Sequence, residues 1–373
     1  MDKEGKTIAF ITLLRGLAVL LIAWDHMVGA WLDWNKASWL PLTFVRQNFT
    51  RPFGIIQDFG FIGVSLLFLM SGFLITLICQ TETRKEFSIK RLFRIYPPLI
   101  VSIILIIAFN WIYAIGAHSH TLIQDLNLQS ILLGCSLANY FFVPQNVLNG
   151  IAWILAVEVL FYFVCFLLLP FLKLRPKISI AFLLLFIVFT LFLAGQFGTS
   201  YFLFAVIVSY FPYLVMGQVL CYFWKRRFGI LEYSFFSIVT MLVCILGLIR
   251  VNPEFIPINN SYILSFFYAY IIFVVSLLFT NRIKIGRLFG FFSKISYSFY
   301  LNQTSSYLWF LVLFPAIGFE FSLGIVFVLL IFLAYLSWRF VEEPSRKFAR
   351  KIITFPFPKS SKIQNFLFEK KEK

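Results

Sequence analysis

The stretch that decides the fold is IAFITLLRGLAVLLIAWDHMVGAW, from Ile8 to Trp31. It is long enough to cross a bilayer, which takes ~20 mostly apolar residues, yet Arg15, Asp25 and His26 lie inside it. Charged side chains at membrane depth are costly and usually have a function. On a helix, Arg15 and His26 fall within ~20° of one face, ~16 Å apart along the axis. We expect this face to hold a guanidinium and an imidazole at different depths, with Asp25 turned ~100° away toward some other group.

The composition is that of a membrane protein. Of the 373 residues, 61% are hydrophobic and 13% are charged, whereas soluble domains are about 45–50% apolar and about 25% charged. The five cysteines are scattered through apolar runs without a C-x-x-C pair, so buried single thiols are expected. Because no metal-ligand cluster is visible, we expect no metal site and no permanently bound cofactor.

Apolar runs of spanning length occur at 8–31, 55–79, 95–116, 151–172, 178–195, 200–224, 229–250, 261–281, 291–317 and 320–341. If the N-terminus is cytoplasmic, most of the 32 lysines and arginines face the cytoplasm, and those in outer segments are Lys36, Arg46, Arg51 and Arg250. This imbalance is the positive-inside signature, and it accounts for the net charge of +16 without nucleic-acid binding. We predict an all-α integral membrane protein with about ten transmembrane helices and both termini cytoplasmic.

The segment 117–150 contains a fairly apolar piece at Ile131–Val143. If this piece spanned the membrane, the later basic clusters would face outward, so we interpret it as interfacial or re-entrant. The first apolar segment lacks a small-residue cleavage site, and we expect it to remain as a helix. The predicted domains are a transmembrane domain at 1–346 and a basic cytoplasmic tail at 347–373.

A second ionisable residue, Glu158, falls in the fourth predicted helix. If that helix starts at the outer surface, Glu158 lies ~10 Å below it, and His26 lies ~8 Å below it by the same rise. A carboxylate that orients an imidazole makes a general base, although Glu158 could instead form an ion pair with another residue. Arg15 lies toward the cytoplasm, where its guanidinium suits a phosphate or a carbonyl oxygen that arrives from inside.

Further blocks follow the Arg15-x10-His26 pair in a fixed order. They are GV at 63–64 with FLMSGFL at 68–74, KRLFRIYP at 90–97, W-x4-E-x2-FY at 153–162, SYSFYL at 296–301 and EEP at 342–344. Together they resemble the membrane acyltransferase-3 family, which acylates extracytoplasmic glycans. The resemblance runs from about residue 8 to 346 and depends on the order of six blocks, since each block alone is weak.

The resemblance implies a ten-helix fold and transfer of an acyl group, usually acetyl from acetyl-CoA, to a sugar hydroxyl. His26 would be the base or, in a two-step version, the acyl carrier, with Glu158 supporting it and Arg15 completing the catalytic set. Arg91 and Arg94 would bind the phosphates of coenzyme A. The other residues expected to bind substrate are Ser71, Trp153, Tyr300 and Gln303.

Structural explanations compete with these roles. Ser71 and Gly72 could simply allow close helix packing, and Arg91 and Arg94 could be part of the topology signal only. We expect the EEP block at 342–344 to pair with nearby arginines and to stop the last helix. His118 and His120 in the outer loop could be solvated bystanders or could contact the acceptor.

The chain departs from the family pattern at three positions. Ile154 stands where the family usually has Ser, Ser65 where an acidic residue is common, and Gln303 where His is frequent. The last change leaves Asn302 and Gln303 as hydrogen-bonding groups without a second titratable side chain. Because a short basic segment follows the last predicted helix, we expect a stand-alone form without an extra extracytoplasmic domain.

The sequence thus predicts a multi-pass O-acyltransferase of a bacterial plasma (inner) membrane. Its partners would be an acyl-CoA donor, a glycan or lipid-linked sugar acceptor and the lipid bilayer, with no nucleic acid. The alternative is a transporter or flippase for lipid-linked sugars, which would use the intramembrane Arg, His and Glu for substrate or proton coupling. A signalling or scaffold protein would not need ionisable groups aligned on one helix face.

Overall fold

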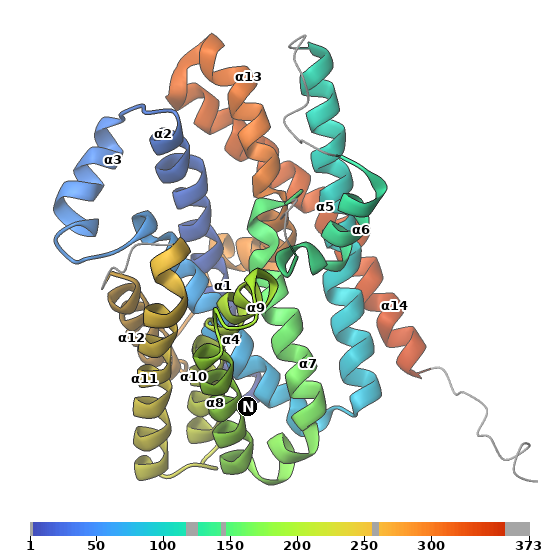
Figure 1. Ribbon diagram of the computed structural model, residues 1–373. Helices are drawn as coiled ribbons and strands as arrows, with labels where there is room; N and C mark the ends of the chain where they lie inside the picture. The colour runs from blue at the N-terminus through green and yellow to red at the C-terminus, as the bar shows by residue number, and fades with distance from the viewer. Residues whose placement is uncertain (1–2, 117–125, 143–146, 256–260, 355–373) are drawn as a thin grey trace, which may run out of the picture.

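The computed structural model describes residues 3–116, 126–142, 147–255 and 261–354, which form helices joined by short turns (Figure 1). No strand occurs within those ranges. Eight helical stretches in them are long and apolar enough to cross a membrane. The prediction of an all-α integral membrane protein is therefore confirmed. The predicted histidines of the outer loop, His118 and His120, lie outside the described residues.

The first half of the chain contains α1 (Lys3–Trp24), η1 (Asp25–Ala30), α2 (Trp31–Trp34), α3 (Leu40–Val45), η2 (Arg46–Thr50), η3 (Gln57–Phe59), α4 (Gly60–Thr81), α5 (Arg84–Gly116), α6 (Leu128–Ser136), η4 (Ala138–Tyr140), η5 (Gly150–Ala152) and α7 (Trp153–Leu174). The second half contains α8 (Pro176–Phe192), α9 (Thr199–Val208), α10 (Phe211–Trp224), α11 (Ile230–Phe255), α12 (Ser261–Leu278), α13 (Arg287–Ser337), η6 (Trp338–Glu342) and α14 (Glu343–Thr354).

Two local features explain why eight stretches of spanning length stand where ten were predicted. The predicted segment 178–195 forms α8, which is a shorter apolar helix of 17 residues. The predicted segments 291–317 and 320–341 are joined in α13, where Gly318 has a φ of 75° and ψ of 177° and turns the chain back. Glycine adopts this conformation without a Cβ clash. Each predicted segment is thus helical, and the sidedness of the membrane stays a prediction.

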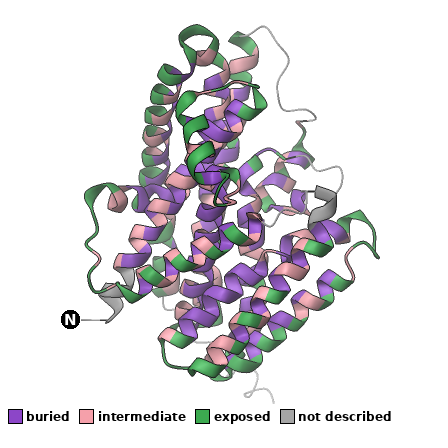
Figure 2. Ribbon diagram, turned by 90° about the vertical axis from the view of Figure 1, so that its left-hand side faces the viewer, coloured by how far each residue is buried: buried purple, intermediate pink, exposed green. Residues whose placement is uncertain are grey.

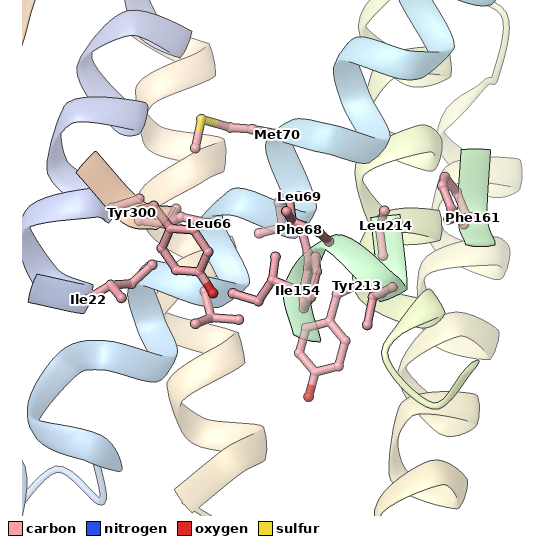
Figure 3. Packing of buried hydrophobic residues seen from close by; sticks show 14 of the residues in the cluster. Ile22, Leu66, Phe68, Leu69, Met70, Ile154, Phe161, Tyr213, Leu214 and Tyr300 are labelled. Carbon is pink, nitrogen blue, oxygen red and sulfur yellow. The ribbon is translucent and has the colours of Figure 1, made fainter. Parts of the chain in front are cut away.

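The centre of the molecule is α4, which packs against α1, α7, α10 and α12. Its apolar residues are buried on nearly all sides, as expected of a helix that is hydrophobic all round. Figure 3 shows Phe68 and Leu69 of α4 close to Tyr213 and Leu214 of α10. Figure 2 shows the same pattern for the whole chain, with buried residues inside and exposed ones on the outer helices.

Helix α1 lies between α4 and the first half of α13. It therefore has one face toward the core helix and another toward α13, so its polar side chains do not need to face lipid. Both ends of the described chain lie at the lower end of the molecule in Figure 1. That end carries the basic segments, and we call it the basic end; the opposite end is the outer end.

The loop piece predicted as interfacial forms α6, a helix of nine residues. It is too short to span a bilayer, and residues 117–125 and 143–146 around it lie outside the described part of the chain. The predicted tail begins as helix, because α14 extends to Thr354 and packs against α5. Residues 355–373 of that tail also lie outside the described residues.

Two glycines allow α4 and α10 to approach closely. A Cβ at Gly72 would overlap the carbonyl group of Leu214, and a Cβ at Gly217 would overlap the carbonyl oxygen of Leu69. Small residues at such crossings are how membrane helices pack without a large hydrophobic driving force. The contacts of Gly72 in the structure are therefore those expected if it serves close helix packing.

We expect Gly217→Ala to lower the thermal stability of the purified protein, because a backbone carbonyl cannot move aside as a flexible side chain does. Overpacking of this kind typically costs ~1–3 kcal/mol. The matched control is Gly324→Ala in α13, where a Cβ meets nothing within 4 Å. Thermal melting followed by size-exclusion chromatography in detergent measures both variants. Equal melting temperatures for the two would contradict the close-packing account.

Candidate active site

His26 lies at the outer end of the molecule, where α1 widens into the π-helical turn η1. Its Nδ1 is 2.7 Å from Oε1 of Gln303 on α13. Because an amide oxygen can only accept, Nδ1 donates the hydrogen bond and Nε2 keeps a free lone pair. The ring is thus held in the tautomer that can accept a proton at Nε2. We call this pair, His26 with Gln303, the outer level.

Arg15 lies nearer the basic end and lines a cavity of about 490 Å³ between α1, α5, α13, η6 and α14. Its cationic lining residues are Arg15, Arg94, Lys294, Arg346, Lys347 and Arg350, opposed by Glu342 and Glu343. We call it the basic cavity. Arg15 and His26 both face α13, as their spacing predicts, but His26 does not line this cavity.

A narrower pocket of about 40 Å³ adjoins the basic cavity, since Arg15 and Arg94 line both. The narrow pocket also contains Arg91, Glu158, Ser71 and Tyr162. The hydroxyl groups of Ser71 and Tyr162 are 2.8 Å apart and hydrogen-bonded. We call the two adjoining spaces the inner level. The structure thus brings together four predicted site residues from α4, α5 and α7 around Arg15.

Glu158 does not lie where the sequence analysis expected it. It belongs to the inner level with the arginines, and the partner of His26 Nδ1 is Gln303. The prediction that Glu158 orients His26 is therefore wrong about the partner. The alternative left open by the sequence, an ion pair of Glu158 with another residue, stays a prediction: among the described residues Glu158 lines the narrow pocket with Arg15, Arg91 and Arg94 without forming an ion pair.

The reason is the depth at which α7 begins. Asn149, just before η5, donates from Nδ2 to the carbonyl oxygen of Leu301 at 3.1 Å. Its Oδ1 accepts from the hydroxyl of Thr304 at 2.7 Å. These residues of α13 flank Gln303, so the start of α7 lies at the outer level. Helix α13 continues outward to Gly318, ~20 Å further along its axis.

The depth predicted for Glu158 from the sequence holds only if α7 starts at the membrane surface. Because α7 starts at the outer level instead, Glu158 lies nine residues or ~13 Å further inward than Asn149. The step from His26 to Arg15 is ~16 Å along α1. The two residues Glu158 and Arg15 therefore arrive at nearly the same depth.

Two predicted substrate-binding residues make structural contacts. The ring of Trp153 packs against Tyr210, with centroids 4.8 Å apart, and against Phe68 at 6.1 Å. The buried hydroxyl of Tyr300 donates to the carbonyl oxygen of Ile151 and so fixes the start of α7 to α13. Neither residue lines the basic cavity or the narrow pocket.

The acidic pair before Pro344 was predicted to bind arginines and to stop the last helix. The ion pairs are present: Glu342 lies 3.5 Å from Arg346, and Glu343 lies 3.3 Å from Arg339. The predicted stop is wrong, because α13 passes through the π-helical turn η6 into α14 without a break. Pro344 directly follows the π-helical turn η6, whose ladder ends with the N–H of Glu343 bonded to the carbonyl oxygen of Trp338. A π-turn locally interrupts the regular α-helical ladder, and a proline beside it does not end the helix.

Sequence reasoning missed the contribution of the last helix to the site. Arg346, Lys347 and Arg350 bring three cations of α14 to the basic cavity, and Lys294 adds one from α13. The Nζ of Lys294 lies 4.0 Å from the ring centre of Trp338, a cation–π contact that positions it. The spacing of the three basic residues on one face of α14 was the signal that could have shown this.

A sequence model described as an acyltransferase domain matches residues 8–339. The chain belongs to the acyltransferase-3 family. A curated relative, O-acetyltransferase OatA of Staphylococcus aureus MRSA252, is 26% identical over 361 residues, which are 82% of this chain and 55% of the relative. OatA of strain NCTC 8325 is 26% identical over 353 residues, 79% of this chain and 54% of the relative. This acyltransferase-3 chain spans about half the length of the curated relatives it matches, and no solved structure matches it.

The geometry of the inner level predicts how the protein responds to loss of Glu158. In Glu158→Gln, the three arginines of the narrow pocket lose the carboxylate they share. Removing one partner from a buried charge cluster costs ~3–5 kcal/mol, so we expect a lower melting temperature. We also expect added sulfate to raise that temperature more in the variant than in the unmodified protein.

The control for this test is Glu232→Gln, which removes a partly exposed carboxylate paired with Lys177 at the same end of the molecule. Exposed pairs contribute ~0–1 kcal/mol, so its melting temperature should change little. A Glu158→Gln protein that melts like the control, with no extra response to sulfate, would refute the charge-balance account.

Proposed function

We propose that this protein is an integral-membrane O-acyltransferase. It would take an acyl group, acetyl in the simplest case, from acyl-CoA at the basic end and transfer it to a hydroxyl of an extracytoplasmic or lipid-linked polysaccharide. The observation that carries the proposal is the pair of levels on one helix, with a cation-lined cavity at Arg15 and an oriented imidazole at His26. Family membership and the name of the OatA relatives support the same chemistry.

The basic cavity suits the anionic part of the donor. Phosphate groups form charge-assisted hydrogen bonds with guanidinium and ammonium groups, and six cationic side chains line the cavity. Arg94 lines both this cavity and the narrow pocket. It would therefore contact the donor molecule at the place where the donor extends from one space into the other. Arg91 stacks on the rings of Phe87 and Tyr162, 5.7 Å from each centroid, and would close the narrow pocket.

His26 would act as the general base. The acceptor hydroxyl oxygen attacks the thioester carbonyl carbon while its proton passes to Nε2 of His26. The carbon–sulfur bond breaks, an ester forms on the sugar, and the coenzyme A thiolate takes up a proton. Gln303 would be a positioning residue, since its hydrogen bond from Nδ1 keeps Nε2 free to accept.

The donor arm would have to cover the distance between the two levels. Asn302 lies on α13 beside Gln303 and one turn outward from Ser298. The hydroxyl of Ser298 donates a hydrogen bond to Glu342 at 3.0 Å. The buried atoms Oδ1 of Asn302 and Oγ of Ser65 have no hydrogen-bond partner among the described residues. Unsatisfied polar atoms are costly inside a membrane protein. A polar donor arm that reaches the outer level would supply hydrogen bonds for such atoms during transfer.

The expected place of action is a bacterial plasma membrane, with the basic end toward the cytoplasm. The charge distribution supports that orientation by the positive-inside rule. A transporter of lipid-linked sugars is the competing proposal, and labelled acetyl-CoA separates the two. Radiolabel that becomes covalently bound to glycan supports the enzyme, whereas glycan that crosses the membrane without modification supports the transporter.

We expect His26→Ala to lower acetyl transfer from radiolabelled acetyl-CoA to glycan by ~100- to 10,000-fold, the usual contribution of general-base catalysis. Stabilisation of the purified protein by coenzyme A should be retained, because His26 does not line the basic cavity. The assay compares transfer rates at equal amounts of membrane-inserted protein. Normal turnover of this variant would disprove the role of His26.

We expect Arg346→Gln to raise the KM for acetyl-CoA by roughly tenfold while kcat changes little, because a charge-assisted phosphate contact contributes ~1.5–3 kcal/mol. The increase should shrink at high salt, which screens such contacts. Lys177→Gln is the matched control, since Lys177 pairs with Glu232 and lies outside the cavity. Equal KM values for the two variants would mean that α14 does not bind the donor.

A further inference from the structure

A separate cavity of about 710 Å³ opens at the outer end, away from the basic cavity. We call it the outer cavity, and its lining includes Asp25, Asp33, Trp34, Arg46, Thr50 and Asp58. These residues come from η1 and α2, from η2 and from η3 just before α4. Its volume lies in the range of small-molecule sites, ~300–1,000 Å³. The mechanism proposed above assigns no role to it.

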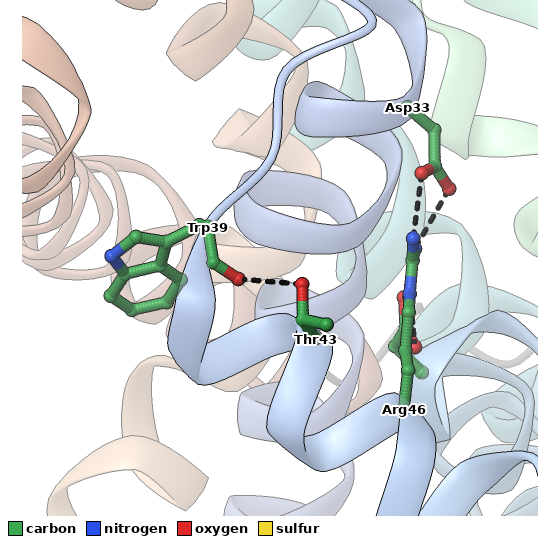
Figure 4. A network of polar contacts seen from close by, with 5 residues as sticks. Asp33, Trp39, Thr43 and Arg46 are labelled. Atoms are coloured by element: carbon green, nitrogen blue, oxygen red, sulfur yellow. Dashed lines mark hydrogen bonds and ion pairs between the residues drawn. The ribbon is translucent and has the colours of Figure 1, made fainter.

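Arg46 holds two of the carboxylates in place. Its Nη1 and Nη2 donate to both oxygens of Asp33 at 2.7 and 2.8 Å, as Figure 4 shows. Its Nε and Nη2 donate to Asp58 at 3.0 and 2.5 Å. These hydrogen bonds raise the pKa of Arg46 above its ordinary value. The guanidinium therefore stays charged and fixes Asp33 and Asp58 as rigid hydrogen-bond acceptors.

Asp25 is different, because it forms no hydrogen bond or ion pair with any residue in the described ranges. It is 9% exposed and lines the outer cavity. A Cβ at Gly29 would come within 2.5 Å of Asp58 Oδ2 and 3.2 Å of Asp25 Oδ1, so the two carboxylates flank the same glycine. The position of Asp25 on α1, turned away from His26, predicts a partner of its own. A carboxylate this buried is costly unless something satisfies it, and the cavity is where that partner can bind.

The backbone around this cavity is also unusual. Gln57, Asp58 and Phe59 have consecutive positive φ angles of 55°, 44° and 78°. Such conformations cost ~1–3 kcal/mol each in residues other than glycine and concentrate at ligand sites. Two π-helical turns, η1 and η2, supply Asp25 and Arg46 to the same space, and π-turns also occur often at functional sites.

The chemistry of the lining favours a neutral polyhydroxyl ligand. Carboxylates accept hydrogen bonds from hydroxyl groups, and the three carboxylates exceed the two guanidinium groups, of Arg46 and Arg51. An acidic sugar would meet this excess of negative charge. The indole of Trp34 is 69% exposed at the cavity, and its flat face can pack against the apolar face of a sugar ring.

We propose that the outer cavity binds a neutral or amine-bearing sugar unit of the acceptor glycan, with Asp25 and Asp58 accepting hydrogen bonds from its hydroxyls and Trp34 packing on the ring. This inference rests on the proposed function for the identity of the ligand. Its geometric basis, the unpartnered Asp25 in a strained and rigid carboxylate site, is independent of the acyl-transfer step.

The test uses oligosaccharides cut from the de-O-acetylated surface polysaccharide of the cells that carry this gene. Acetyl transfer to them is measured for the full chain and for the variants Asp25→Asn and Trp34→Ala. We expect the KM for the oligosaccharide to rise roughly tenfold or more in each, because hydrogen bonds to charged groups are strong. The KM for acetyl-CoA should stay within about twofold.

The matched control is Glu320→Gln, which removes a carboxylate at the same end of the molecule but outside the outer cavity. Its KM for the oligosaccharide should equal that of the unmodified protein. Stability provides a second measurement, because Asp25→Asn replaces a buried carboxyl group that has no hydrogen-bond partner among the described residues. We expect its melting temperature to stay the same or rise while glycan binding weakens, whereas a purely structural role would lower the melting temperature.

Failure of the inference and failure of the proposed function give different results. An unchanged KM for the oligosaccharide in both variants, with normal transfer, overturns the sugar site alone. If the unmodified protein transfers no acetyl group, the proposed function fails, and direct binding of fluorescently labelled oligosaccharide decides the inference. Loss of oligosaccharide binding in both variants supports the sugar site. Equal oligosaccharide binding by the unmodified protein and both variants overturns it. A rise in the melting temperature of the unmodified protein with calcium but not with oligosaccharide overturns it as well.

Discussion

The constraint on which the rest of the site depends is the burial of the Arg15 guanidinium inside a membrane protein. A charge at that depth must have polar neighbours and opposite charge. Helices α7 and α13 with η6 supply these through Glu158, Tyr297 and Glu342. Helices α5 and α14 also converge there. The cations they add give the inner level an excess of positive charge that an anionic ligand would balance.

Much of the fold could be predicted from hydropathy alone. Each predicted spanning segment is helical, because long apolar runs satisfy their backbone groups only as helices inside a bilayer. The turn at Gly318 and the short length of α8 could not be predicted, since both depend on local backbone geometry. The helix end expected at Pro344 is absent for a similar reason, because the π-helical turn η6 just before this proline already interrupts the regular ladder.

The site was predicted in part. The common face of Arg15 and His26 follows from helical periodicity, which acts within one helix. The depth of Glu158 does not follow from periodicity, because it depends on where α7 starts relative to α13. That start is fixed by the hydrogen bond between Asn149 and Leu301, which lie 152 positions apart in the sequence. Gln303 was recognised as a departure from the family pattern. Its hydrogen bond to His26 required the packing of α1 on α13 to be known.

The continuity of α1 between Arg15 and Trp24 has one more consequence. No turn interrupts this segment, so it is a rigid rod that sets the span between the two levels at ~16 Å. If the phosphates of the donor are anchored at one end of this rod, the thioester must reach the other end by its own length. Helix α1 would then act as a ruler, and an acyl carrier with a shorter arm would bind without delivering its cargo.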